Sequence, residues 1–214
     1  MIQNETLQFL TDVSRNRDAE WIARHRPEFR GAKADLTRFA VSVLKQLAAM
    51  DRRVIVANPD PRNCISLFPR GRMHSSQFSM VIRVAPTPSA SATYFVDLQP
   101  GRCYSGGGLR SPTSELSRLF RQKMMTDTGR WREIVEGRVF RKFFPAGLTD
   151  GEETLARAPL NNHDALDSLN LRSFGACHHL PDALIQSPEA ISQIVRSFAA
   201  ARPLVDYINR AAMA

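Results

Sequence analysis

The sequence predicts an α+β fold, in which an antiparallel sheet in the middle of the chain is packed by N-terminal and C-terminal helices. Before residue 50 and after residue 111, apolar residues recur every three or four positions, as in amphipathic helices. Between these regions, short segments rich in β-branched and aromatic residues are separated by turn-forming loops. Because no helix-length segment intervenes, neighbouring strands should run antiparallel.

The first quarter of the chain is predicted to be helical. A short helix should cover residues 4–13, with Asn4 as its N-cap. Residues 19–50 should form two further helices, because Pro27 suits the first turn of a new helix. The second of these carries a wide apolar stripe, and we expect four of its side chains to face the core: Leu36, Phe39, Val43 and Leu47.

Four strands are predicted in the middle of the chain, at residues 63–68, 78–84, 93–98 and 101–108. The last strand follows a turn at Gln99-Pro100-Gly101. It ends in three consecutive glycines at 106–108, which we interpret as a turn into the next helix. Ser111 should be the N-cap of that helix and Pro112 its first residue.

The rest of the chain is predicted to be mostly helical, with one more strand at residues 171–179. Short helices are expected at residues 129–135, 138–144, 164–171 and 188–201. The last of these should be broken at Arg202-Pro203, before a further helical segment at residues 204–212, because proline lacks the N–H that a helix needs. The chain has no internal repeat and no long linker, so residues 1–214 should form a single α+β domain.

Composition limits the class of protein. The apolar fraction of 43% and the charged fraction of 23% are those of a soluble globular chain. No apolar run approaches the ~20 residues of a membrane span, and the N-terminus lacks the pattern of a signal peptide. The three cysteines are widely spaced, which favours free and mostly buried thiols over disulfides. We therefore expect a cytoplasmic protein with no membrane partner.

The net charge of +8 favours anionic partners. The basic residues are 25 arginines and 4 lysines, and they are spread along the chain without a block of five or six. This arginine-rich but dispersed pattern indicates a generally basic surface rather than a dedicated nucleic-acid groove.

Short motifs follow one another along almost the whole chain: QFL (8–10), NRDAEW (16–21), QPG (99–101), GGG (106–108), RAP (157–159), His163, LNLRSF (169–174) and ARPLVDYINRA (201–211). Their order resembles an uncharacterised bacterial and fungal family, domain-of-unknown-function family 2461. The resemblance implies a single α+β domain. It implies no activity that could be transferred to this chain.

The chain departs from the family pattern in one loop. Typical members carry Arg-Phe-Ser-Lys-Asp-Lys-Thr-Pro-Tyr-Lys after the first strands, whereas residues 72–81 here read RMHSSQFSMV and keep only Arg72. The residue after GGG-Leu is usually aromatic in the family and is Arg110 here. Any active site that the family places in this loop should be lost or altered in this member, so we transfer no catalytic role.

The glycine triplet is the strongest candidate for a binding site. It is not a P-loop or a dinucleotide fingerprint, because no Gly-Lys-Ser/Thr follows and no parallel βαβ unit surrounds it. Glycines allow a ligand to approach the backbone, and the N-terminus of the next helix offers free N–H groups to an anion. The expected ligand-binding patch comprises Arg70, Arg72, Arg102, Gly106, Gly107, Gly108 and Arg110. The alternative is that the triplet only bends a strand and Ser111 only caps a helix.

Other reactive side chains form weaker patterns. The histidines lack metal-ligand spacing, and the adjacent His178 and His179 should point to opposite faces of a strand. We therefore assign no metal site, and no cofactor follows from the sequence. The remaining candidates for nucleophiles, acids or bases have simpler explanations as loop, buried or helix-terminal residues: His74, Ser75, Ser76, Cys103, Cys177, Asp164 and Asp167.

These observations favour a soluble binding domain for an anionic small molecule or a protein partner. Two alternatives stay open: a hydrolase or transferase acting on an anionic, phosphorylated substrate, and a nucleic-acid binder. An enzyme should have a deep pocket with an acid or base beside the arginines. A nucleic-acid binder should have a continuous basic face and a steep salt dependence. A partner-binding module should expose an apolar patch of several hundred Å².

Overall fold

The computed structural model describes residues 1–16, 19–67, 78–84, 92–110, 112–149 and 169–211. Its helices are α1 (Asn4–Arg15), α2 (Ala19–Arg24), α3 (Arg26–Met50), α4 (Arg53–Ala57), the 3₁₀ helix η1 (Pro61–Cys64), α5 (Ser114–Thr126), α6 (Thr128–Val135), α7 (Arg138–Phe143), α9 (Asp182–Ile185) and α10 (Ala190–Ala211). Its strands are β1 (Ile65–Leu67), β2 (Phe78–Ile82), β3 (Thr93–Leu98), β4 (Cys103–Leu109), β5 (Leu148–Thr149) and β6 (Phe174–Leu180).

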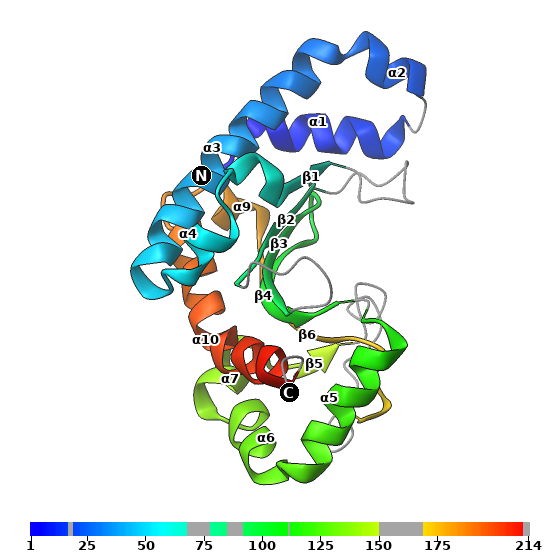
Figure 1. The fold of residues 1–214 in the computed structure, drawn as a ribbon. Helices are drawn as coiled ribbons and strands as arrows, with labels where there is room; N and C mark the ends of the chain where they lie inside the picture. Colours follow the sequence, from blue (N-terminus) through cyan, green and yellow to red (C-terminus); the bar gives the residue numbers. More distant parts are fainter. Residues whose placement is uncertain (17–18, 68–77, 85–91, 111, 150–168, 212–214) are drawn as a thin grey trace. The chain divides into compact units, whose positions relative to one another are not determined.

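The described strands form a six-stranded antiparallel sheet in the order β1-β2-β3-β4-β6-β5 (Figure 1). In the pair β1 and β2, Ile65 lies opposite Met80, and in the pair β5 and β6, Leu148 lies opposite Ala176. Helices precede the sheet in the chain and follow its fourth strand. The predicted α+β fold with a central antiparallel sheet is therefore confirmed.

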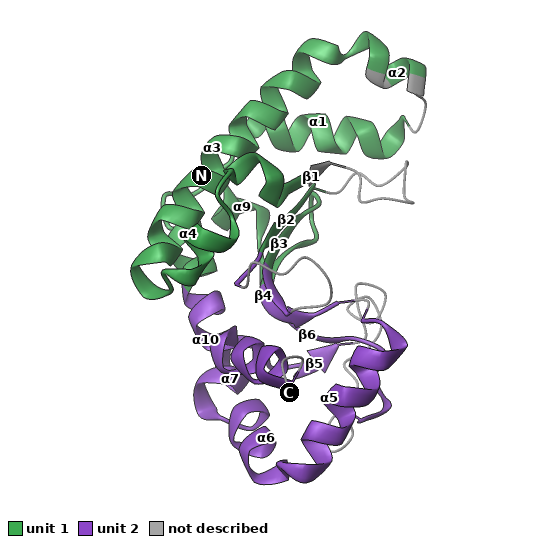
Figure 2. Ribbon diagram, in the orientation of Figure 1, with its two compact units in different colours: residues 1–82, 95–105, 179–195 green, residues 83–94, 106–178, 196–214 purple. Residues whose placement is uncertain are grey.

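The chain divides into two compact units, which Figure 2 shows in different colours. Unit 1 comprises residues 1–82, 95–105 and 179–195, and unit 2 comprises residues 83–94, 106–178 and 196–214. Strands β3, β4 and β6 and helix α10 each contribute residues to both units. The expectation of a single domain stays a prediction.

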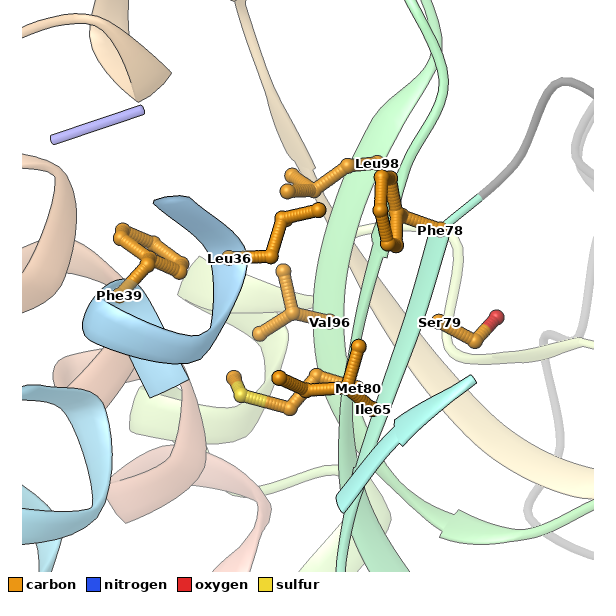
Figure 3. A pocket seen from close by; sticks show the side chains of 8 residues that line it. All are labelled: Leu36, Phe39, Ile65, Phe78, Ser79, Met80, Val96 and Leu98. Atoms are coloured by element: carbon orange, nitrogen blue, oxygen red, sulfur yellow. The ribbon is translucent and has the colours of Figure 1, made fainter. Parts of the chain in front are cut away.

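The core of unit 1 forms where α3 faces strands β2 and β3. The four stripe residues expected to face the core are at most 5% exposed, which confirms that prediction: Leu36, Phe39, Val43 and Leu47. Figure 3 shows Leu36 of α3 directed toward apolar side chains of the strands, while Ser79 points to the other side of its strand. The alternation of β2 thus gives the sheet an apolar face for α3.

A buried carboxylate joins α1 to α3 in unit 1. Asp35 of α3 is 4% exposed. It accepts hydrogen bonds from the Thr6 hydroxyl (2.8 Å) and from the backbone N–H of Gln3 (2.9 Å). The bond from the Gln3 N–H accounts for the start of α1, because Gln3 occupies the N-cap position. Asn4, the predicted N-cap, is instead the first helical residue.

Sequence reasoning missed several short elements, namely α4, η1, β5 and α9, which have two to five residues each. Elements of this length show too few repeats for hydrophobic periodicity to reveal them.

Helix α5 begins at Ser114, and the Thr113 hydroxyl accepts from the backbone N–H of Leu116 (3.2 Å), so Thr113 is the N-cap instead of the predicted Ser111. Ser111 and most of the helix predicted at 164–171 lie outside the described residues.

Helix α10 runs without interruption from Ala190 to Ala211, so the predicted break at Arg202-Pro203 is wrong. A proline inside a helix leaves the carbonyl four residues earlier without its backbone donor. That carbonyl belongs to Ala199, and both Ala199 and Pro203 are exposed, so water can hydrogen-bond to it. The other side of the helix is fully buried at Ile194, Phe198, Ala201, Leu204, Val205 and Ile208.

Candidate functional site

The glycine triplet lies inside strand β4, and all three glycines are buried. A Cβ on Gly107 would lie 2.9 Å from both Ala201 Cβ and Val205 Cγ2 of α10. Gly108 has a φ of +139°, and a Cβ there would lie 2.2 Å from the carbonyl oxygen of Phe174 in β6. Gly107 and Gly108 therefore allow close packing of α10 and β6 on β4, and the interpretation of the triplet as a turn is wrong.

The arginines of the predicted patch are spread over the two units and the undescribed part of the chain. Arg70 and Arg72 lie outside the described residues. Arg102 is an exposed residue of unit 1. Arg110 is a half-buried residue of unit 2, which also contains the buried Gly106, Gly107 and Gly108. Anion binding by this set of residues stays a prediction, but Gly107 and Gly108 have a packing role that needs no ligand.

The histidines that the structure describes make local contacts. His25 stacks on Trp21 with ring centroids 3.8 Å apart, and His179 lies edge-on to Tyr104 at 5.5 Å. The Nδ1 atom of His178 lies 3.0 Å from the carbonyl oxygen of Phe143. Among the described residues, no group of three or more His, Cys, Asp or Glu side chains could hold a metal ion. Six further candidates lie outside the described residues: His74, Ser75, Ser76, His163, Asp164 and Asp167.

The cysteines are free thiols, as predicted. Cys103 is fully buried at the end of the QPG turn, where Asp182 accepts a hydrogen bond from the backbone N–H of Gly101 (2.8 Å). Burial, with the nearby charge of Asp182, raises the pKa of the Cys103 thiol from 9.0 to about 12. Because the thiolate is the nucleophilic form, this environment makes Cys103 a structural residue.

Unit 1 contains a small cavity between α3 and strands β1 to β3 (Figure 3). Its volume is about 10 Å³, which is near the minimum that a single water molecule needs. Its lining is apolar apart from Ser79, whose hydroxyl donates to Asp97 (2.6 Å). The cavity is a minor packing defect and cannot hold a substrate.

Unit 2 contains a much larger cleft of about 380 Å³. One wall comes from α5, α6 and their junction, and it presents Lys123, Asp127, Arg130 and Ile134. The other wall comes from α10 and presents Arg202, Pro203, Asp206, Tyr207 and Arg210. We call this the α10 cleft, and it is the candidate functional site.

Cations outnumber carboxylates in the α10 cleft by four to two. Each wall holds one internal ion pair, since Lys123 lies 3.0 Å from Asp127 and Arg202 lies 3.6 Å from Asp206. Arg130 pairs with Glu133 at 2.8 Å, where both side chains are mostly exposed. Arg210 makes no ion pair with any described residue and is exposed, so its guanidinium is open to a ligand.

Tyr207 joins the two walls. Its hydroxyl donates to the backbone carbonyl of Lys123 (3.2 Å), and its ring packs 5.6 Å from that of Trp131. Burial and the charge of Asp127 raise the pKa of Tyr207 from 10.0 to about 12. The phenol therefore stays protonated at neutral pH, and it holds α10 against α5.

The sequence analysis did not find the α10 cleft, although a signal was present. Arg202, Asp206 and Arg210 are four residues apart, so they lie on one face of a continuous helix. The expected break at Pro203 hid this spacing. No local pattern links these residues to Lys123 and Arg130, which lie more than 70 positions away in the chain.

The fold and the cleft together define an α+β protein with a charged cleft between helices. Residues 5–207 match the family described as "Conserved hypothetical protein (DUF2461)", so the chain belongs to this family, as its motifs suggested. Searches of curated proteins and of solved structures gave no match. Within the described ranges, none of the helices is long and apolar enough to span a bilayer.

Proposed function

We propose that this protein is a binding domain for a small organic anion and that the α10 cleft is its binding site. The observation that carries the proposal is the excess of two positive charges among the residues that line a cleft of about 380 Å³. This volume lies within the usual range for small-molecule sites, roughly 300 to 1,000 Å³. Three of the four cations are arginines, whose planar donors suit carboxylate and phosphate groups.

Binding fits the α10 cleft better than catalysis. A general base needs a pKa near the working pH, but the pKa of Tyr207 is raised to about 12. Asp127 and Asp206 each lie in an ion pair with a cation of their own wall. A hydrolase or transferase therefore lacks an evident acid or base among the residues that line the cleft.

The proposed compartment is the cytoplasm. Cys64 and Cys103 are buried free thiols and Cys177 is a half-buried one, a state that reducing compartments maintain. Mass spectrometry of the unreduced, unfolded and alkylated protein should find all three cysteines labelled.

Calorimetric titration with inorganic phosphate and with citrate tests the proposal. We expect saturable binding of at least one anion. Arg210→Gln should weaken that binding about ten- to a hundredfold, because a charge-assisted hydrogen bond contributes roughly 1.5 to 3 kcal/mol.

Arg196→Gln is the matched control, because Arg196 is an exposed arginine of α10 that does not line the cleft. This variant should bind as the unmodified protein does. Equal weakening in both variants would mean that the general positive charge attracts the anion and would contradict a site in the cleft.

A further inference from the structure

We infer that the ligand of the α10 cleft is amphipathic: an anionic phosphate or carboxylate group attached to a compact apolar body. This inference rests on the proposed function and names the chemical class of its ligand. The observation behind it is that the charged side chains that line the cleft are more exposed than two of its apolar side chains.

The charged side chains form an exposed rim. The side chains of Arg130, Arg202 and Lys123 are 59%, 41% and 40% exposed. Long cationic side chains at this exposure keep their charged ends in water and can turn toward a bound anion. Asp127 and Asp206 lie beside them, with side chains 36% and 23% exposed.

Two residues that line the cleft, Ile134 and Tyr207, are nearly buried, and we call them its deep surface. Each is only 6% exposed. The Tyr207 hydroxyl is already bonded to the carbonyl of Lys123, so what this residue presents to a ligand is the small exposed part of its ring. Pro203, which is exposed, adds an apolar ring to the wall formed by α10.

A ligand of purely polar character would use only the charged rim of this site. A small inorganic anion can pair with the rim arginines, but it leaves the surface of Ile134 and Tyr207 in contact with water. A long polyanion would bring further negative charges close to Asp127 and Asp206, which repel them. An anion with an apolar substituent pairs with the rim and displaces water from the deep surface.

The size of the cleft limits the substituent. A volume of about 380 Å³ corresponds to roughly a dozen water molecules at ~30 Å³ each. An aromatic ring or a short alkyl chain with one anionic group fits this space, whereas a two-chain lipid does not.

The test compares phenyl phosphate with methyl phosphate, two monoesters of equal charge that differ in the apolar body. Calorimetric titration should give a dissociation constant about tenfold lower for phenyl phosphate, equivalent to about 1.4 kcal/mol. Benzyl alcohol, which has the ring without the anion, should not bind measurably. Arg210→Gln should weaken both phosphates by the same factor and leave their ratio unchanged.

A matched pair of variants examines the deep surface. In Ile134→Thr and Ile134→Val the new side chains have nearly the same shape, but only threonine carries a hydroxyl. The preference for phenyl phosphate should persist in Ile134→Val and fall toward unity in Ile134→Thr, with circular dichroism confirming that both remain folded.

The outcomes separate this inference from the proposed function. Equal, Arg210-dependent affinity for the two phosphates would overturn the amphipathic ligand and leave anion binding intact. If neither phosphate binds, or if benzyl alcohol binds as tightly as phenyl phosphate, anion binding in the cleft is itself overturned.

Discussion

Gly107 and Gly108 show how single residues determine the packing of unit 2. Gly107 lies beneath α10, where the side chains of Ala201 and Val205 occupy the space that a Cβ would need. Gly108 combines a φ of +139° with a backbone contact to β6, and a backbone carbonyl cannot move aside as a side chain can. The two glycines therefore serve close packing, which local sequence patterns cannot distinguish from ligand access.

Substitutions at these glycines should differ in cost. Gly108→Ala should lower the free energy of unfolding by about 2 to 6 kcal/mol, since it adds backbone strain to a steric clash. Gly107→Ala, which meets mainly side chains, should cost about 1 to 3 kcal/mol. Urea denaturation measures both.

Gly31→Ala provides the control, because a Cβ at this helical position has no atom within 4 Å. It should stabilise the protein by about 0.5 to 1 kcal/mol. Similar values for the variants at 31 and 108 would contradict the packing role.

The Cys103 thiol makes stability depend on pH in the alkaline range. The pKa of this thiol is about 12 in the folded protein and 9.0 without the protein environment. Between these values the folded protein keeps a proton that the unfolded chain releases, so the free energy of unfolding should fall as pH rises from about 9 to 12. Tyr207, with its pKa raised from 10.0 to about 12, contributes in the same direction.

Denaturation at several pH values, with Cys103→Ala as the comparison, measures this effect. The variant should lose less stability over the same range. An identical pH dependence in both proteins would show that Cys103 does not hold its proton in the folded state.

Among the elements, α10 shows that tertiary packing can outweigh an unfavourable local helix propensity. A proline in a helix interior is unfavourable by about 3 kcal/mol relative to alanine. The buried side of α10 includes Phe198, Leu204, Val205 and Ile208, all with no exposed surface, and each such side chain contributes about 1.5 to 3 kcal/mol. Packing therefore keeps the helix continuous past Pro203.

Pro203→Ala should restore the missing backbone hydrogen bond to Ala199 and raise the free energy of unfolding by about 1 to 3 kcal/mol. It should also weaken phenyl phosphate binding, because the proline ring lines the α10 cleft. Thermal denaturation measures the first effect and calorimetry the second. If Pro203→Ala is instead less stable than the unmodified protein, packing of the core depends on a bend that Pro203 causes in the helix.

Helix α3 was predictable because its stripe repeats over many turns. Leu47 is completely buried, so Leu47→Ala should lower the free energy of unfolding by about 2 to 5 kcal/mol. Val41 lies on the same helix and is 45% exposed, so Val41→Ala should change the free energy of unfolding by less than about 0.5 kcal/mol. Equal effects in the two variants would show that the stripe does not face the core.

Across the whole molecule, contacts between distant segments account for what sequence reasoning missed. The order of helices and strands follows from local periodicity, and most elements lie where it predicted. The α10 cleft depends on the contact between Tyr207 and Lys123, which are 84 positions apart, and periodicity carries no information about such pairs. The predicted arginine patch relied on proximity in sequence alone.

Several family motifs also have long-range structural roles in unit 2. Asn209 accepts from the backbone N–H of Ala92 (2.7 Å) and donates to its carbonyl (3.1 Å), so it ties α10 to the start of β3. Arg121 donates to the carbonyls of Leu169 (2.8 Å) and Leu171 (2.7 Å). These bonds show why parts of ARPLVDYINRA and LNLRSF matter to the fold without reference to a ligand.

The most direct test of the α10 cleft as the anion site is to map backbone amide chemical shifts while phenyl phosphate is titrated into isotope-labelled protein. If the anion binds in the cleft, the shifts should concentrate at residues 123–134 and 202–210, the two ranges that contain the lining residues. Shifts centred on residues 102–110 would support the patch predicted from sequence and contradict the cleft. The absence of any saturable shift would contradict anion binding altogether.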